Sequence, residues 1–70
     1  MKNEKELNSL YIELQSIENR GITIWLADEI CSSFEIVHEV MLHEECTYMR
    51  DYVFEGERLK ELHFDRVACI

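Results

Sequence analysis

The chain has 70 residues, and 47% of them are apolar, which suits one small globular domain over residues 1–70 rather than a disordered segment. Acidic residues number 15 against seven Lys and Arg, and the net charge of −8 argues against direct nucleic-acid binding and against docking on an anionic membrane. No apolar run is long enough to cross a membrane, and the start, MKNEKELNSL, lacks the apolar stretch of a signal peptide, so we expect a cytoplasmic protein.

The first expected element is a helix between Asn3 and Gly21. Asn3 suits the cap at its start, with Glu6 placed to reach back to it, and Gly21 suits the position just past its end. The apolar residues of this segment recur every three or four positions and form one narrow stripe: Leu7, Leu10, Leu14 and Ile17. A stripe this narrow predicts a helix that packs with one face on another part of the structure or on a second molecule.

A strand is expected over residues 22–26, because apolar residues alternate there with Thr23 and Trp25. Trp25 falls on the face opposite the apolar positions, where it is either exposed or covered by the first helix. Residues 27–31, ADEIC, are expected to form a turn or loop.

A second helix is expected over residues 33–45. Ser32 and Glu35 have the spacing of a capping box, and Cys31 and Ile36 lie where a hydrophobic staple would form. The expected buried face consists of Phe34, Val37, Val40 and Met41. The opposite face carries Glu35, Glu39 and His43.

Residues 47–67 are expected to form a β-hairpin, because aromatic and β-branched residues flank the turn sequence EGER. With Glu55 and Gly56 as the two turn residues, opposite charges face each other across the strands. The pairs in this register are Asp51 with Lys60, Arg50 with Glu61 and Met49 with Leu62. The element order is then α-β-α-β-β, and we expect a two-layer α+β fold in which both helices cover one face of a three-stranded, mainly antiparallel sheet.

The stretch DEICSSFEIVHEVMLHEECTYM, residues 28–49, contains no Lys or Arg. Glu35 and Glu39 repel each other one helical turn apart, and Glu44 and Glu45 lie beside the negative end of the helix dipole. The alternative is a solvated surface that keeps the protein soluble. Because these placements oppose local stability, we expect the charge to serve binding of a basic protein surface, with an aromatic anchor beside it. The expected partner-binding residues are Asp28, Glu29, Glu35, Glu39, Glu44, Glu45 and Trp25.

Three Cys and three His raise the hypothesis of a zinc site, although no CxxC pair is present. In the expected hairpin register, four of these side chains come within reach of one place, and they are the candidate ligands of Zn²⁺: His43, Cys46, His63 and Cys69. The alternative is that the cysteines are small buried apolar residues and the histidines are surface residues. In the cytoplasm all three cysteines would be reduced, and their odd number fits poorly with a closed set of disulfides.

The sequence does not favour an enzyme. Cys31 precedes a helix start, which can lower a thiol pKa, but His38 lies nearly two turns further along the helix and is poorly placed to act as its base. Glu44 and Glu45 could act as an acid and base, although they are better explained as solvated charges. A chain of 70 residues also leaves little room for a substrate pocket.

With FEIVHEVMLHEE as its charged face, the chain resembles the small acidic anti-CRISPR proteins of phages and mobile elements, by size, charge and architecture. That resemblance implies a stoichiometric inhibitor of a type II effector nuclease, which occupies a basic surface and blocks nucleic-acid loading. The alternative is a structural or regulatory homodimer, such as an antitoxin-like or accessory factor stabilised by zinc, with the narrow stripe of the first helix and Trp25 at the subunit interface.

Overall fold

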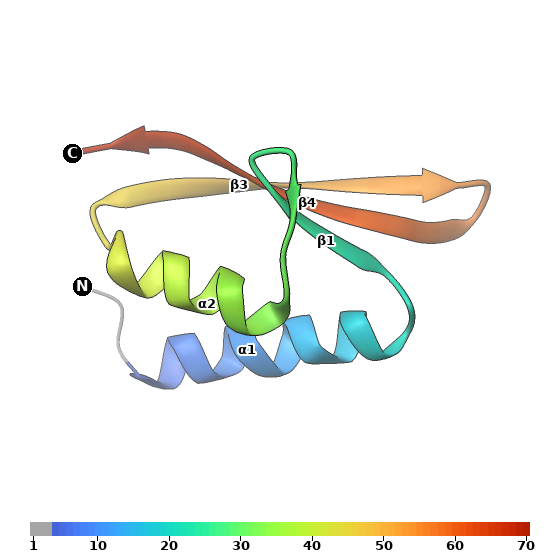
Figure 1. The fold of residues 1–70 in the computed structure, drawn as a ribbon, viewed down its shortest axis with the longest axis horizontal. Helices are drawn as coiled ribbons and strands as arrows, with labels where there is room; N and C mark the ends of the chain where they lie inside the picture. The colour runs from blue at the N-terminus through green and yellow to red at the C-terminus, as the bar shows by residue number, and fades with distance from the viewer. Residues whose placement is uncertain (1–3) are drawn as a thin grey trace.

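The computed structural model describes residues 4–70 as a layer of two helices packed on one side of a four-stranded sheet (Figure 1). The elements are α1 (Glu4–Asn19), β1 (Thr23–Leu26), β2 (Glu29–Ile30), α2 (Ser33–Leu42), β3 (Cys46–Glu55) and β4 (Arg58–Cys69). The strand order is β2-β1-β4-β3, with β1 and β4 parallel and the other neighbours antiparallel. The predicted α+β class is confirmed, but the sheet is mixed and has one strand more than predicted. Neither described helix combines the length and the apolar character needed to cross a membrane.

The additional strand, β2, follows a two-residue turn formed by Ala27 and Asp28. Both residues have positive φ angles, 47° and 69°, and Leu26 pairs with Glu29 across the turn. This is the backbone pattern of a type I′ hairpin turn, which Asn-Gly or Asp-Gly usually signals in a sequence. Because ADEIC lacks that signal, the sequence predicted only a turn or loop.

The apolar stripe of α1 packs inside the chain and forms part of its core. Leu14 and Ile17 are buried, and Leu7 and Leu10 pack against the core cluster. The predicted period of this helix is therefore confirmed, but the stripe does not remain available as a subunit interface. The predicted cap at Asn3 lies outside the described residues. The other buried members of the cluster are Ile22, Ile24, Ile36, Val40, Leu62 and Phe64.

The predicted capping box of α2 is confirmed. The backbone N–H of Glu35 donates to the Ser32 hydroxyl, the N–H of Ser32 donates to the Glu35 carboxylate, and both distances are 3.1 Å. The helix ends at Leu42, earlier than the predicted residue 45. The start of α2 was predicted correctly because a capping box depends only on residues three positions apart.

The predicted buried face of α2 is wrong for two of its four residues. Phe34 is 65% exposed and Met41 is 45% exposed, whereas Ser33, Ile36 and Val40 are buried. Ile36 and Cys31 both pack on the core, in the positions of a hydrophobic staple. With Ile36 and Val40 turned into the core, Phe34 and Met41 remain at the surface.

The β3–β4 hairpin exists, but its predicted register is wrong. Glu55 pairs with Arg58, so the turn residues are Gly56 and Glu57, and Gly56 supplies the positive φ of 64°. Irregularities at Thr47/Tyr48 and Val53/Phe54 shift the register further along the strands. The residues that oppose Met49, Arg50 and Asp51 are therefore Asp65, Phe64 and His63.

The new register gives the basic side chains of the hairpin other partners than those predicted. Arg50 reaches Glu13 of α1 at 2.9 Å and lies over the Phe64 ring, 5.3 Å from its centroid. Lys60 pairs with Glu55 at 3.1 Å. Arg50 and Arg66 thus form ion pairs with carboxylates of the helices, Glu13 and Glu39, and each also lies over an aromatic ring of the opposite hairpin strand.

Candidate functional site

A cavity of about 460 Å³ lies where the β1–β2 turn, α2, β3 and β4 meet, and it is the best candidate for the acidic binding site. Its carboxylates come from different elements, Glu29 from β2 and Glu39 from α2. We call it the Glu29–Glu39 cavity. Its lining consists of Leu26, Ala27, Glu29, Glu39, Tyr48 and Arg66.

The interior of the Glu29–Glu39 cavity has both charged and aromatic character. Arg66 binds the Glu39 carboxylate at 2.8 Å and lies over the Tyr48 ring, 5.9 Å from its centroid. The Tyr48 hydroxyl oxygen is buried and has no hydrogen-bond partner within residues 4–70. Glu29 is exposed and has no ion pair there, so it is the carboxylate that remains open to a cation from outside.

The pKa of the Cys31 thiol is affected by the carboxylates of this region. Its pKa is raised by burial and then by the carboxylates of Glu35, Glu29 and Glu39. Carboxylates from α2 and from β2 thus both act on the Cys31 thiol. A raised pKa is the opposite of what a nucleophilic cysteine needs.

Three of the predicted acidic residues already have partners in the fold. Glu39 contacts Arg66 and lies 3.4 Å from the His43 ring, and Glu35 serves the capping box. Glu45 lies 3.5 Å from His43, and its pKa is lowered chiefly by a hydrogen bond from its own backbone N–H, with help from His43. Internal contacts therefore occupy half of the predicted acidic surface.

The other three predicted carboxylates, Asp28, Glu29 and Glu44, are exposed and have no ion pair in the described part of the chain. Asp28 and Glu29 form the β1–β2 turn and the strand that follows it, and Glu44 comes just after α2. These residues could not be separated from the paired ones before the fold was known, because Arg66 lies 27 positions after Glu39.

Trp25 does not line the Glu29–Glu39 cavity, and it points to the sheet face opposite the core, because its neighbour Ile24 is buried in the core and successive side chains of a strand alternate. It is half-buried and stacks on His63, with 5.4 Å between the ring centroids. The buried indole N–H has no acceptor in residues 4–70. Exposed apolar side chains share this sheet, including Ile30 and Met49. Trp25 is therefore not covered by α1, and it does not lie beside the acidic residues that it was expected to anchor.

The structure does not bring the predicted zinc ligands together. Cys46 and Cys69 face each other across β3 and β4 and form a disulfide, so neither offers a thiolate, and they are not reduced as predicted. His63 lies six positions before Cys69 on β4, about 20 Å away at the rise of a strand. Ligand atoms of His43, Glu45 and Cys46 do lie within 4.8 Å of one another, but the sulfur is the disulfide sulfur. The expected hairpin register did not place Cys46 opposite Cys69, so the disulfide was not predicted.

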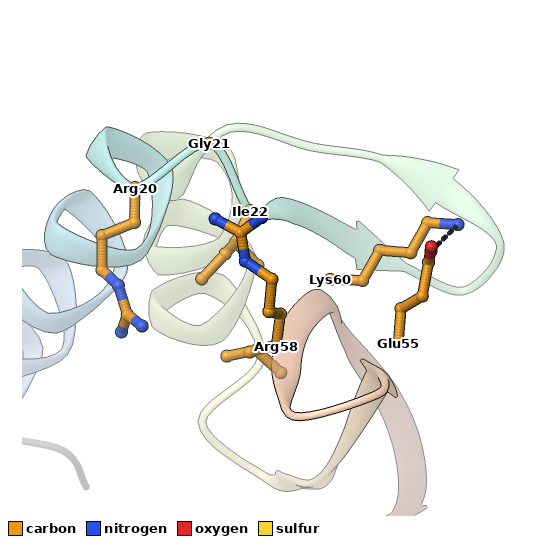
Figure 2. A pocket seen from close by; sticks show the side chains of 7 residues that line it. Arg20, Gly21, Ile22, Glu55, Arg58 and Lys60 are labelled. Carbon is orange, nitrogen blue, oxygen red and sulfur yellow. Dashed lines mark ion pairs between the residues drawn. The ribbon is translucent and has the colours of Figure 1, made fainter.

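A second cavity, of about 310 Å³, collects three of the basic side chains near the end of α1 (Figure 2). Arg20, Arg58 and Lys60 border it, but Lys60 is bound to Glu55. Figure 2 shows the Arg20 and Arg58 guanidinium groups pointing in different directions, away from the Lys60 amine. The three cations therefore do not converge on a point where one anion could sit.

No protein-family model matches the chain, and comparison with curated proteins and with solved structures likewise finds no match.

Proposed function

We propose that this chain is a small acidic protein-binding inhibitor that occupies a basic surface of a nucleic-acid-handling protein, such as a type II CRISPR effector nuclease, and so blocks nucleic-acid loading. Its binding surface consists of the exposed carboxylates of the β1–β2 turn, of β2 and of the segment after α2: Asp28, Glu29 and Glu44. Glu35, Glu39 and Glu45, which already have partners in the fold, add to the negative potential of this surface.

One observation carries the proposal: Glu29 and Glu39 line the same cavity, Arg66 pairs with Glu39, and Glu29 has no ion pair within residues 4–70. Repulsion between such groups costs stability unless an opposite charge relieves it. A Lys or Arg of a partner can reach Glu29 at the mouth of the cavity. Nucleic acid would add more negative charge to the same place, which favours a basic protein surface.

Binding, and not catalysis, is the proposed activity. Cys31 is the free thiol of the described residues, and its raised pKa keeps it protonated. A thiolate is the reactive form in cysteine catalysis. The cavity also presents Arg66 already bound to Glu39, which suits a fixed recognition surface.

The test is an assay of target-DNA binding by guide-loaded and guide-free type II effector nucleases, with the protein added in stoichiometric excess. The wild type is expected to reduce DNA binding, and the triple variant Asp28→Lys, Glu29→Lys, Glu44→Lys is expected to lose the effect. Raising the salt concentration should weaken inhibition, because exposed charges are screened beyond about 8 Å at physiological ionic strength.

The matched control is the triple variant Asp51→Lys, Glu57→Lys, Asp65→Lys. It makes the same change in net charge at exposed positions on β3, the hairpin turn and β4. This control should inhibit like the wild type. Equal loss of inhibition in both triple variants would show that total charge matters and its placement does not. DNA binding that is unchanged by the wild-type protein would reject the proposed target class.

The uncovered side of the sheet supports a second candidate function, a regulatory homodimer. Ile30 is 65% exposed and Met49 is 55% exposed, and Trp25 lies on the same sheet. Sedimentation of the wild type and of Met49→Glu distinguishes the candidates. A wild-type dimer that this substitution dissociates would favour the homodimer, whereas a monomer favours the inhibitor.

The proposed target places the protein in the cytoplasm, where thiols are kept reduced. Binding must then survive reduction of the Cys46–Cys69 disulfide. Inhibition measured with and without dithiothreitol checks this requirement, and inhibition confined to the oxidised protein would exclude a cytoplasmic role.

A further inference from the structure

An apolar groove runs between α1 and α2 on the outer surface of the helix layer. Its volume is about 390 Å³. Figure 1 shows α2 lying antiparallel to α1 and alongside its first half, which agrees with the residues that line the groove. The lining consists of Glu4, Leu7, Asn8 and Tyr11 from α1 and Phe34, Val37 and Met41 from α2.

The groove is apolar because α2 turns Ile36 and Val40 into the core and leaves Phe34 and Met41 at the surface. Phe34 stacks on His38, with 5.9 Å between ring centroids, and does not enter the core. Phe34 and Met41 are separated by about 10 Å along the helix axis, at 1.5 Å per residue. This is two helical turns, which matches the spacing of apolar anchors at i, i+3 or i+4, and i+7 on a bound helix.

The charges in the groove's lining and on α2 are negative, and the nearby Lys5 borders an adjoining hollow that shares Glu4 and Asn8 with the groove. Glu4 is the charged residue of its lining, and Glu18 lies on the Tyr11 side of α1, two turns further on. Between residues 21 and 49 there is no Lys or Arg, so α2 and its flanking segments contribute only carboxylates. Because α2 runs antiparallel to α1, the segment that carries Glu44 follows the end of α2 near the start of α1 (Figure 1).

We propose that this groove binds an amphipathic basic helix of the partner protein, with apolar side chains between α1 and α2 and Lys or Arg side chains toward the acidic ends. The inference rests on the proposed function, since it gives the form of the basic partner. Apolar contact supplies the affinity, and charge selects the partner and its orientation.

Charge also argues against a second copy of this chain as the occupant. A symmetric dimer would place the same groove of both copies face to face. Each copy carries a net charge of −8, and the same acidic ends would approach each other. A basic helix relieves the repulsion that a second copy would increase.

The probe is a fluorescently labelled peptide of Leu and Lys, about 18 residues or five turns long, with its Leu residues on one helical face. Two reference peptides are used, a scrambled sequence without an apolar face and a Leu-Glu peptide with the same pattern. Anisotropy titration should show the Leu-Lys helix binding at least tenfold more tightly than either reference. Its affinity should fall at least tenfold in the variant Phe34→Ala, Met41→Ala.

The matched control is Ile12→Ala, Leu42→Ala, which removes exposed apolar side chains of the same helices that do not line the groove. This control should keep wild-type affinity, and circular dichroism should show both double variants folded. Binding that survives Phe34→Ala, Met41→Ala but is lost in Asp28→Lys, Glu29→Lys, Glu44→Lys would reject the groove and leave the proposed function standing. No preference for the Leu-Lys helix, or a wild-type dimer that Phe34→Ala dissociates, would also reject the inference.

Discussion

At the scale of single residues, the β1–β2 turn uses Ala27 where the backbone favours another residue. Its φ angle of 47° lies in the left-handed region, where a Cβ atom approaches the following carbonyl oxygen. Asp28, at 69°, tolerates this region better because its side chain can hydrogen-bond locally. Ala27 also lines the Glu29–Glu39 cavity, so the strained position adjoins the candidate site.

Replacing Ala27 with Asn should stabilise the protein. Asn is enriched in the left-handed region, and relief of the Ala27 strain should raise the free energy of unfolding by about 0.5 kcal/mol. The urea midpoint measures the change. The control is Ala68→Asn on β4, an exposed residue with a negative φ, where no gain is expected. A loss of stability in Ala27→Asn would contradict the turn geometry.

The pKa of Cys31 is raised first by burial and then by nearby carboxylates, so removing one carboxylate isolates the acidic contribution. Because that pKa is raised, the rate of alkylation by iodoacetamide should reach its midpoint above the pH of an ordinary thiol. Glu29→Gln removes one of the carboxylates responsible and should move the midpoint to lower pH. Glu57→Gln, in the hairpin turn, should leave it unchanged. Equal profiles for wild type and Glu29→Gln would show that Glu29 does not act on this region.

The same shift fixes the sign of a pH effect on stability. The folded state favours the protonated Cys31 thiol, so this contribution is fully present below the ordinary thiol pKa. It is lost as the pH rises through the folded pKa, because the unfolded thiol ionises first. Free energies of unfolding measured on the alkaline side should therefore fall less steeply in Cys31→Ser than in the wild type.

At the scale of elements, the sequence predicted what depends on neighbouring residues. The apolar stripe of α1 and the capping box of α2 are local signals, and both are confirmed. The rotation of α2 and the hairpin register depend on distant contacts. Arg50, for example, pairs with Glu13, which lies 37 positions away, and not across the hairpin with Glu61. Charge pairing across β3 and β4 was therefore a poor guide to register.

The cap of α2 can be tested by Ser32→Ala. The substitution removes the acceptor of the Glu35 N–H and should lower the free energy of unfolding by about 1 kcal/mol. Thermal unfolding followed by circular dichroism measures the loss. Ser16→Ala, an exposed position inside α1, is the control and should be neutral or slightly stabilising. Equal effects at both positions would contradict the capping role.

At the scale of the whole molecule, ion pairs connect the helix layer to the sheet. Because their partners lie far apart in the sequence, these pairs could not be predicted at the candidate site. The sequence located the acidic stretch, but Arg66 of β4 neutralises Glu39 only after the chain has folded. Trp25 was predicted beside those carboxylates and lies on the other side of the sheet. The acidic character of α2 and the β1–β2 turn could be read from the sequence, while the pairing of Glu39 with Arg66 required the tertiary structure.

The Cys46–Cys69 disulfide closes a loop over a sequence separation of 23. Its removal by Cys69→Ala should lower the free energy of unfolding by about 3 kcal/mol, from the greater entropy of the unfolded chain. Urea denaturation measures the loss, and dithiothreitol should have no further effect on this variant. Cys31→Ser is the control and should keep the wild-type response to dithiothreitol, since Cys31 is free.

The inner strand β4 is also the last described element to leave the ribosome. It lies between β1 and β3 and supplies Leu62 and Phe64 to the core. During translation, α1, β1 and α2 emerge with their apolar sides open, and β1 has no neighbour on the β4 side. A nascent chain that stalls before residue 58 is therefore expected to remain sensitive to proteases and to recruit chaperones.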